Sequence, residues 1–184
     1  MPAPNLSPEQ LDQVSELVAE YISGQRNCFR QRAYAQSEAQ KSLLGLFFRP
    51  DLLETTRILV LENERISNPV FYPMLRGLGF SNLPDFALMA AVTFHDVVVS
   101  HEPFSDGLLF HELVHVEQYR QLGVPRFAAL YVRGFVAGGG YDGIPLEMSA
   151  YALGAKFESA PQQPFSVESE VASWIQQDKF LSGA

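Results

Sequence analysis

FHELVHVEQYRQLG, residues 110–123, contains the pattern from which the rest of the chain can be interpreted. His111 and His115 are separated by about 400° of rotation on a helix, so both side chains would leave the same face. Both imidazoles could then bind one ion at about 2.0–2.1 Å. Glu112 would lie about 100° further round, where it reaches a water on the metal more easily than the metal itself. The pattern HExxH therefore predicts two nitrogen ligands and a carboxylate base.

The residues around this pattern predict a buried helix. The apolar flanking positions are Leu108, Leu109, Phe110, Leu113, Val114 and Val116. Two histidines and a glutamate in such a helix would be costly to bury without partners, and a metal ion would satisfy all three. The alternative is a pair of core histidines that hydrogen-bond to neighbouring protein groups.

The composition and charge of the chain exclude several classes of protein. With 184 residues and 47% hydrophobic residues, the chain is expected to form one domain. We divide it into N-terminal helices (1–50), a strand-containing part (51–104) and the metal-site helices (105–184). The net charge of −8 argues against nucleic-acid binding, which needs a basic surface. The local basic cluster of Arg26, Arg30 and Arg32 is interpreted as the solvated face of a helix.

Neither a secretion signal nor an apolar run long enough to cross a membrane is visible in the sequence. We therefore expect no membrane partner and a cytoplasmic protein by default, with export by a non-classical route as the alternative. Cys28 is the single cysteine, so neither an internal disulfide nor a thiolate metal cluster is expected.

Helix and strand signals predict an α+β fold. Ser7 and Gln10 form a capping-box pattern that begins a helix ending near Gly24. Residues 86–100 predict two strands joined by a tight turn at His95-Asp96, or one bent strand. Ser105 or Asp106 would cap the HExxH helix, which ends at Gly123. The other expected elements are helices over 34–48, 126–136, 145–157 and 166–180, a strand over 57–61, and a loop around Asn68-Pro69 and glycines 77 and 79. The order predicts a mostly helical protein with a small antiparallel sheet before the metal helix.

HELVH followed by Val116 and Gln118 resembles the zincin metallopeptidases, most closely bacterial zincin-like domains whose motif reads HELTHVxQ. In those domains a strand hairpin leads into the metal helix, as residues 86–100 would here. The longer metzincin motif is absent, because Gln118 and Gln121 occupy its glycine and histidine positions. The resemblance, over about residues 87–156, is thus to the gluzincin branch and implies that a glutamate on a later helix is the third ligand.

The third ligand has several candidates, namely Glu117, Asp142, Glu147 and Glu158 downstream and His95, His101 and Glu102 upstream. Glu117 would point away from the ion, about 200° round the helix from His115. Asp142 lies among glycines and Glu158 at a helix end. Glu147 lies in the first turn after Pro145 within an apolar pattern, where a carboxylate is expensive to bury unless it meets positive charge. We predict Glu147; a first-turn acid facing solvent is the alternative.

Four further residues are candidates for supporting roles. Tyr151, one turn after Glu147, could hydrogen-bond a ligand, and Gln118 falls on the metal face, where it could do the same. Tyr141, Tyr151 and His95 could donate a hydrogen bond to a developing oxyanion. The alternatives are ordinary packing for the tyrosines, a turn position for His95 and a solvated side chain for Gln118.

The sequence thus predicts a zincin-like metallopeptidase with one Zn²⁺ held by His111, His115 and Glu147. Glu112 would act as the general base on a zinc-activated water, and the partner would be a peptide or protein substrate. The alternative is a non-catalytic zinc-binding module that serves an interaction or structural purpose.

Overall fold

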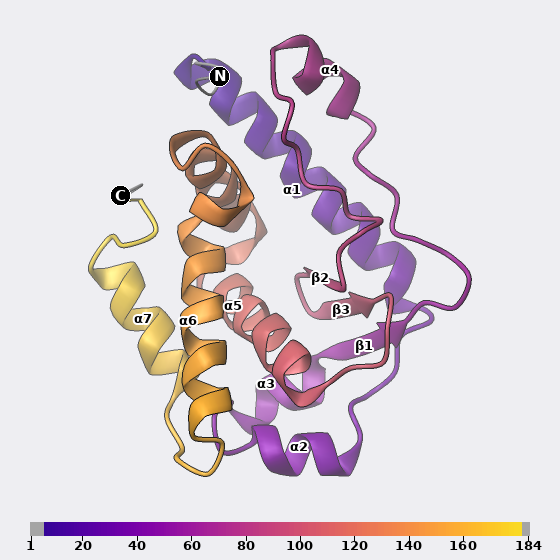
Figure 1. Cartoon of the computed structure of the whole chain (residues 1–184), viewed down its shortest axis with the longest axis vertical. Coiled ribbons are helices and arrows are strands. Elements are labelled where there is room, and N and C mark those ends of the chain that lie inside the picture. Colours follow the sequence, from indigo (N-terminus) through magenta and orange to yellow (C-terminus); the bar gives the residue numbers. More distant parts are fainter. Residues whose placement is uncertain (1–5, 182–184) are drawn as a thin grey trace.

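The long helix that carries the HExxH pattern runs through the middle of the fold, with helices on both sides of it (Figure 1). The structure is a computed structural model and describes residues 6–181. Its helices are α1 (Pro8–Arg30), α2 (Glu38–Leu44), α3 (Pro50–Thr55), α4 (Tyr72–Gly77), α5 (Asp106–Ala137), α6 (Pro145–Ser159) and α7 (Val167–Gln176), with a 3-10 turn η1 (Tyr141–Gly143). Its strands are β1 (Arg57–Val60), β2 (Ala91–Phe94) and β3 (Val97–Ser100). Within residues 6–181, none of the helices has the length and apolar character needed to cross a membrane.

The sheet precedes α5, as predicted, but it is mixed rather than antiparallel. The strand order is β1-β3-β2, with β2 antiparallel to β3 and β1 parallel to β3. The predicted hairpin at His95-Asp96 joins β2 and β3, and His95 has a φ of 59°. The strand over 57–61 is present as β1, but the prediction of a wholly antiparallel sheet was wrong. The direction of β1 is set by a long connection through α4, and such a connection permits parallel pairing.

The central strand β3 explains how the sheet is held between α1 and α5. All four of its residues are buried, as expected for a strand covered on both faces. Val98 belongs to the main core, formed largely with α5, whereas Val97 and Val99 pack in a second cluster with Phe29 of α1. Figure 1 shows α6 and α7 on the side of α5 away from α1. The sheet and α6 therefore approach α5 from different directions.

The helix that follows the Ser7 cap is longer than its glycine suggests. Ser7 and Gln10 form the predicted capping box, but α1 continues past Gly24 to Arg30. A side chain at Gly24 would meet nothing within 4 Å, so this is a surface position. Burial of Ile22 and Phe29 on either side of Gly24 holds the helix together.

Two other boundaries differ from the prediction. The helix expected over 34–48 is reduced to α2, because Tyr34 pairs with Ile58 at the sheet and Ser37 caps the helix only afterwards. The segment expected as loop contains α4, which begins at Tyr72-Pro73. A short apolar helix and a loop are difficult to distinguish when the pattern covers less than two turns.

Gly123 divides α5 at the position where the metal helix was predicted to end. The backbone there has a φ of 73° and a ψ of 159°, a combination that is open almost only to glycine. Pro125 then stands in the first turn of the second half of α5. The chain therefore changes direction at Gly123, and residues 124–137 form the second helix that the sequence predicts.

Candidate metal centre

Three side chains on two helices direct their donor atoms at one point. His111 and His115 are on α5, and Glu147 is in the first turn of α6. Their ligand atoms all lie within 4.8 Å of one another. The Nε2 atoms of the histidines are 3.2 Å apart, and Glu147 Oε2 is 3.2 Å from His115 Nε2 and 3.6 Å from His111 Nε2. The group could hold a metal ion.

The size of this triangle can be compared with that of a tetrahedral metal site. With metal–ligand distances of about 2.0–2.1 Å, the ligand atoms of a tetrahedron are separated by about 3.3 Å. The three separations, 3.2, 3.2 and 3.6 Å, are close to this value on every edge. The protein alone therefore holds the donor atoms at a spacing that suits a small divalent ion.

The approach of α6 to α5 depends on Gly134. A Cβ atom built at Gly134 would lie 2.7 Å from Pro145 Cδ and 3.4 Å from Ile144 Cα. Only a residue without a side chain allows the start of α6 to come so near. Ile144 and Leu146, on either side of Pro145, are fully buried. This contact brings Glu147 to the histidines, and Glu147 is itself only 5% exposed, so it does not face solvent.

Gln118 orients His115. Its side-chain oxygen accepts a hydrogen bond from His115 Nδ1 at 2.8 Å, which leaves Nε2 directed at Glu147. The Gln118 amide nitrogen donates to the Leu146 carbonyl at 3.0 Å and to Ser149 Oγ at 2.9 Å. The side chain is completely buried, so it is not a solvated glutamine. Gln118 thereby links the histidine of α5 to the backbone of α6, and this type of support is common around protein metal sites.

The charges of the triad reinforce one another. Burial on its own would lower the pKa of His115, but the neighbouring Glu147 carboxylate outweighs it and raises the pKa to about 9. Burial likewise opposes ionisation of Glu147, yet the two histidines hold its pKa well below the usual range. Without a cation, Glu147 and His115 form a buried ion pair. A divalent cation would replace the proton on His115 as the partner of the carboxylate.

Tyr141 completes the surroundings of Glu147. Its hydroxyl donates to Glu147 Oε2 at 2.8 Å. Burial, and then the charge of Glu147, raise the pKa of Tyr141 far above its ordinary value, so the hydroxyl keeps its proton. Tyr141 lies in η1, directly before α6. It therefore acts as a donor to the carboxylate, not as the free oxyanion donor that the sequence left open.

Glu112 lies beside the triad and is held by the sheet. Its Oε2 accepts a hydrogen bond from Thr93 Oγ1 at 2.7 Å. Thr93 is on β2, whose alternation turns its hydroxyl to α5 while Phe94 packs on the side of α1. The Tyr119 hydroxyl donates to the Thr93 carbonyl at 3.4 Å. Glu112 is only 5% exposed, which keeps its carboxylate in one position near the histidines.

The centre opens to the surface through a groove of about 670 Å³. The groove is lined by Met89 just before β2 and Ala91 at its start, by His111 and Glu112, and by Tyr151 of α6. The Tyr151 ring lies 4.5 Å from the ring of His111, and its side chain is 56% exposed. An incoming molecule would therefore meet His111, Glu112 and Tyr151 together.

The structure places the other ligand candidates away from the triad. His101 is engaged at both nitrogens, by the Met89 carbonyl at 2.6 Å and the Ile66 amide at 3.1 Å. His95 lies in the hairpin turn, 3.4 Å from the Asp96 carboxylate. Neither belongs to the group of atoms that meet at the triad.

The three other downstream acidic candidates also lie outside the triad. Glu117 is buried and accepts hydrogen bonds from Arg120 and Gln121, on the side of α5 that faces Glu168 of α7. Glu158 is exposed and lines the outer groove. Asp142 is exposed in η1.

Three residues of the centre were not identified from the sequence: Thr93, Tyr119 and Ser149. Thr93 did carry a signal, since it is a polar residue among apolar ones in the strand just before the HExxH helix. Tyr119 and Ser149 act through the way in which α5, α6 and the sheet pack. No local pattern marks such residues.

The three arginines of the basic cluster, Arg26, Arg30 and Arg32, all form ion pairs within the protein. Arg26 and Arg30 both bind the Asp96 carboxylate, at 2.7 and 2.8 Å. Arg32 pairs with Glu64. Arg26 and Arg30 thus tie α1 to the hairpin turn, and Arg32 ties the chain just after α1 to the segment after β1.

Comparisons with known proteins give no family for this chain. No protein-family model matches it, and neither the curated proteins nor the solved structures contain a match. The resemblance to gluzincins therefore stays a prediction from the HExxH pattern, and the function has to be inferred from the site itself.

Proposed function

We propose that the protein is a zinc-dependent peptidase whose ion is held by His111, His115 and Glu147. The observation that carries this proposal is the triangle of donor atoms with edges of 3.2, 3.2 and 3.6 Å, which suits tetrahedral zinc. The ligand set of two histidines and a glutamate with one position left open is typical of catalytic rather than structural zinc sites. The adjacent groove gives a substrate access to that open position.

The metal would act as a Lewis acid: it would polarise the scissile carbonyl and lower the pKa of a bound water to about 7. Glu112, held by Thr93, takes one proton from the attacking water. The water oxygen bonds to the carbonyl carbon, and the carbonyl oxygen receives the negative charge. When the carbon–nitrogen bond breaks, Glu112 returns its proton to the departing amine, so the products are a carboxylic acid and an amine.

Two features of the groove suit an extended peptide. β2 is an edge strand, with β3 on one side only, and residues 89–91 at its start line the groove. A peptide could add to this edge by main-chain hydrogen bonds. Tyr151 stands on the opposite wall beside His111, and we assign its hydroxyl as the donor to the developing oxyanion.

The test is cleavage of a broad peptide library by the zinc-loaded protein and by Glu112→Gln. The amide retains the shape of the glutamate but cannot accept the proton, so we expect the variant to bind zinc like the native protein and to lose at least about 100-fold in rate. Glu20→Gln, a matched change at an exposed position on α1, should cleave like the native protein.

The alternative function makes a different prediction in the same experiment. A zinc-binding module without turnover would bind the ion and cleave no peptide in the library. Equal cleavage by Glu112→Gln and the native protein would show that the assigned base is wrong.

A further inference from the structure

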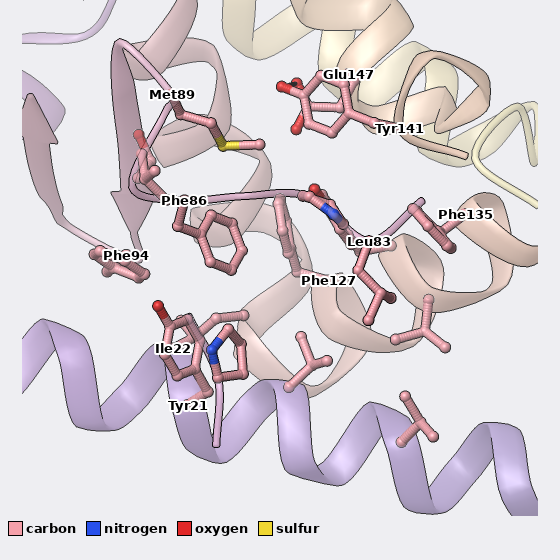
Figure 2. Close-up of a pocket in the computed structure, with 18 of the residues that line it drawn as sticks. Tyr21, Ile22, Leu83, Phe86, Met89, Phe94, Phe127, Phe135, Tyr141 and Glu147 are labelled. Carbon is pink, nitrogen blue, oxygen red and sulfur yellow. Dashed lines mark hydrogen bonds between the residues drawn. The ribbon is translucent and has the colours of Figure 1, made fainter. Parts of the chain in front are cut away.

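A second cavity lies on the inner side of the metal centre and holds about 120 Å³. Figure 2 shows its walls: Ile22 of α1, Leu83 and Phe86 of the segment before β2, and Phe127 and Phe135 of the second half of α5. Glu147 and Tyr141 stand at one end of the space, and α1 closes the opposite side. The cavity therefore extends from the metal ligands into the apolar interior.

The chemistry of the walls indicates what the cavity can accept. Away from the metal centre its lining is almost entirely aliphatic and aromatic. A water molecule needs about two to four polar partners to be held in a buried site, so the apolar part is a poor place for ordered water. A charged group would be still more costly to transfer there. An apolar group is the occupant that these walls favour.

The cavity and the surface groove meet at the metal centre. Met89, Ala91, Glu112 and Tyr141 line both spaces, and His115 and Glu147 line the cavity. A substrate lying in the groove with its scissile bond at Glu112 would therefore have the mouth of the cavity next to that bond. A side chain adjacent to the bond is the part of the substrate that could enter.

The volume limits the size of that side chain. A dry cavity of about 150 Å³ lined by leucine, isoleucine and phenylalanine accepts one benzene molecule, and the cavity here, about 120 Å³, is slightly smaller. We propose that it is the specificity pocket of the enzyme, and that it receives one aromatic or large aliphatic side chain next to the hydrolysed peptide bond. This inference rests on the proposed peptidase function for its substrate, but the capacity of the cavity to bind an apolar group does not.

Part of the cavity wall comes from segments outside the region of the sequence that resembles zincin-like domains. Ile22 and Leu83 come from parts of the chain outside residues 87–156, over which the sequence resembles zincin-like domains. The pocket is therefore a feature of how α1 and the segment before β2 cover the metal helix in this protein. Leu83 is partly buried and lies outside helices and strands, so its side chain can be changed with little effect on regular structure.

The first experiment measures benzene binding to metal-free protein by NMR titration, in the native chain and in Leu83→Trp. The native protein should bind benzene with resonance changes at Phe127 and Phe135, and Leu83→Trp, which fills the cavity, should lose binding at least tenfold. Leu88→Trp is the matched control, because Leu88 is 82% exposed and outside the cavity. If the native protein does not bind benzene, the cavity is not an apolar binding pocket, whatever the peptidase activity of the protein.

The second experiment uses zinc-loaded protein and peptides that differ only at the residue next to the cleaved bond. Phenylalanine or leucine there should give a kcat/KM at least about tenfold above alanine or lysine, the range expected for apolar groups in a fitted pocket. Leu83→Trp should reverse this preference, so that the alanine peptide is cleaved best. Leu83→Ala should allow a tryptophan peptide to be cleaved as well. The control variants Leu88→Trp and Leu88→Ala should keep the preference of the native protein.

The remaining outcomes separate the two proposals. Equal cleavage of all four peptides by the native protein, or a preference for the lysine peptide, would overturn the assignment of the pocket. Benzene binding without cleavage of any peptide would leave the apolar pocket in place and reject the peptidase function. If Leu83→Trp does not fold, the native protein's benzene titration and peptide series still decide.

Discussion

Replacement of Gln118 by leucine tests whether the buried amide prepares His115 for the metal. The leucine side chain fills a similar volume but offers no acceptor to His115 Nδ1, which lies 2.8 Å from the Gln118 oxygen. The Leu146 carbonyl would keep its hydrogen bond from Ser149 Oγ at 2.8 Å. The main new defect is therefore one unsatisfied N–H on a histidine side chain that is 7% exposed.

The size of the effect follows from that defect. An unsatisfied buried donor costs about 1–3 kcal/mol, so the free energy of unfolding of the metal-free protein should fall by about that amount. Loss of the group that orients a metal-binding histidine typically weakens metal affinity by about 10–100-fold. Zinc affinity would be measured by competition with a chelator of known affinity, and stability by chemical denaturation.

The matched control is Gln121→Leu on the same helix. Gln121 donates to Glu117 and to the Glu168 carbonyl, so this variant also loses partly buried hydrogen bonds but none to the metal centre. It should lose stability and keep native zinc affinity. If Gln118→Leu binds zinc within twofold of the native protein, the role given to Gln118 is refuted.

Four further substitutions test separate parts of the structure. Gly134→Ala should displace the start of α6, because the added Cβ would lie 2.7 Å from a carbon of Pro145. The displacement would move Glu147 and weaken zinc binding. Native zinc affinity in a chelator competition would contradict this. Tyr141→Phe removes the donor to Glu147 and should weaken zinc binding about tenfold, whereas Tyr151→Phe should leave zinc affinity unchanged and lower kcat. Asp96→Asn should lower the free energy of unfolding at pH 7 by about 1–2 kcal/mol. Burial opposes ionisation of Asp96, but hydrogen bonds from His95 and Arg26 and the charges of Arg26 and Arg30 hold its pKa far below the usual range. The stabilisation from Asp96 is thus present above the unfolded pKa of about 3.9 and should shrink steadily in denaturation curves at lower pH.

The parts of the centre that follow from local periodicity could be predicted from the sequence. The spacing of His111 and His115 places them on one face of any helix, and the apolar flanks indicate that this helix is buried. The carboxylate of Glu147 stood out because an acid inside an apolar helix pattern needs a positive partner. The α+β class and the sheet before the metal helix were also confirmed, because both were predicted from patterns within short segments.

What could not be predicted depends on contacts between distant segments. The direction of β1 follows from a connection of some thirty residues whose path no local pattern determines. The hydrogen bond from Thr93 to Glu112 depends on which face of β2 meets α5. The apolar cavity exists only because α1 and the segment before β2 cover the second half of α5. Residues in such roles have ordinary neighbours in the sequence.

The most direct test of the account is the zinc content of the purified protein after dialysis against a buffered excess of zinc, measured by elemental analysis. We predict about one zinc ion per chain for the native protein and almost none for His111→Ala and His115→Ala, because two remaining ligands hold the ion too weakly. A folded native protein that takes up no zinc would contradict the metal centre and, with it, the proposed function.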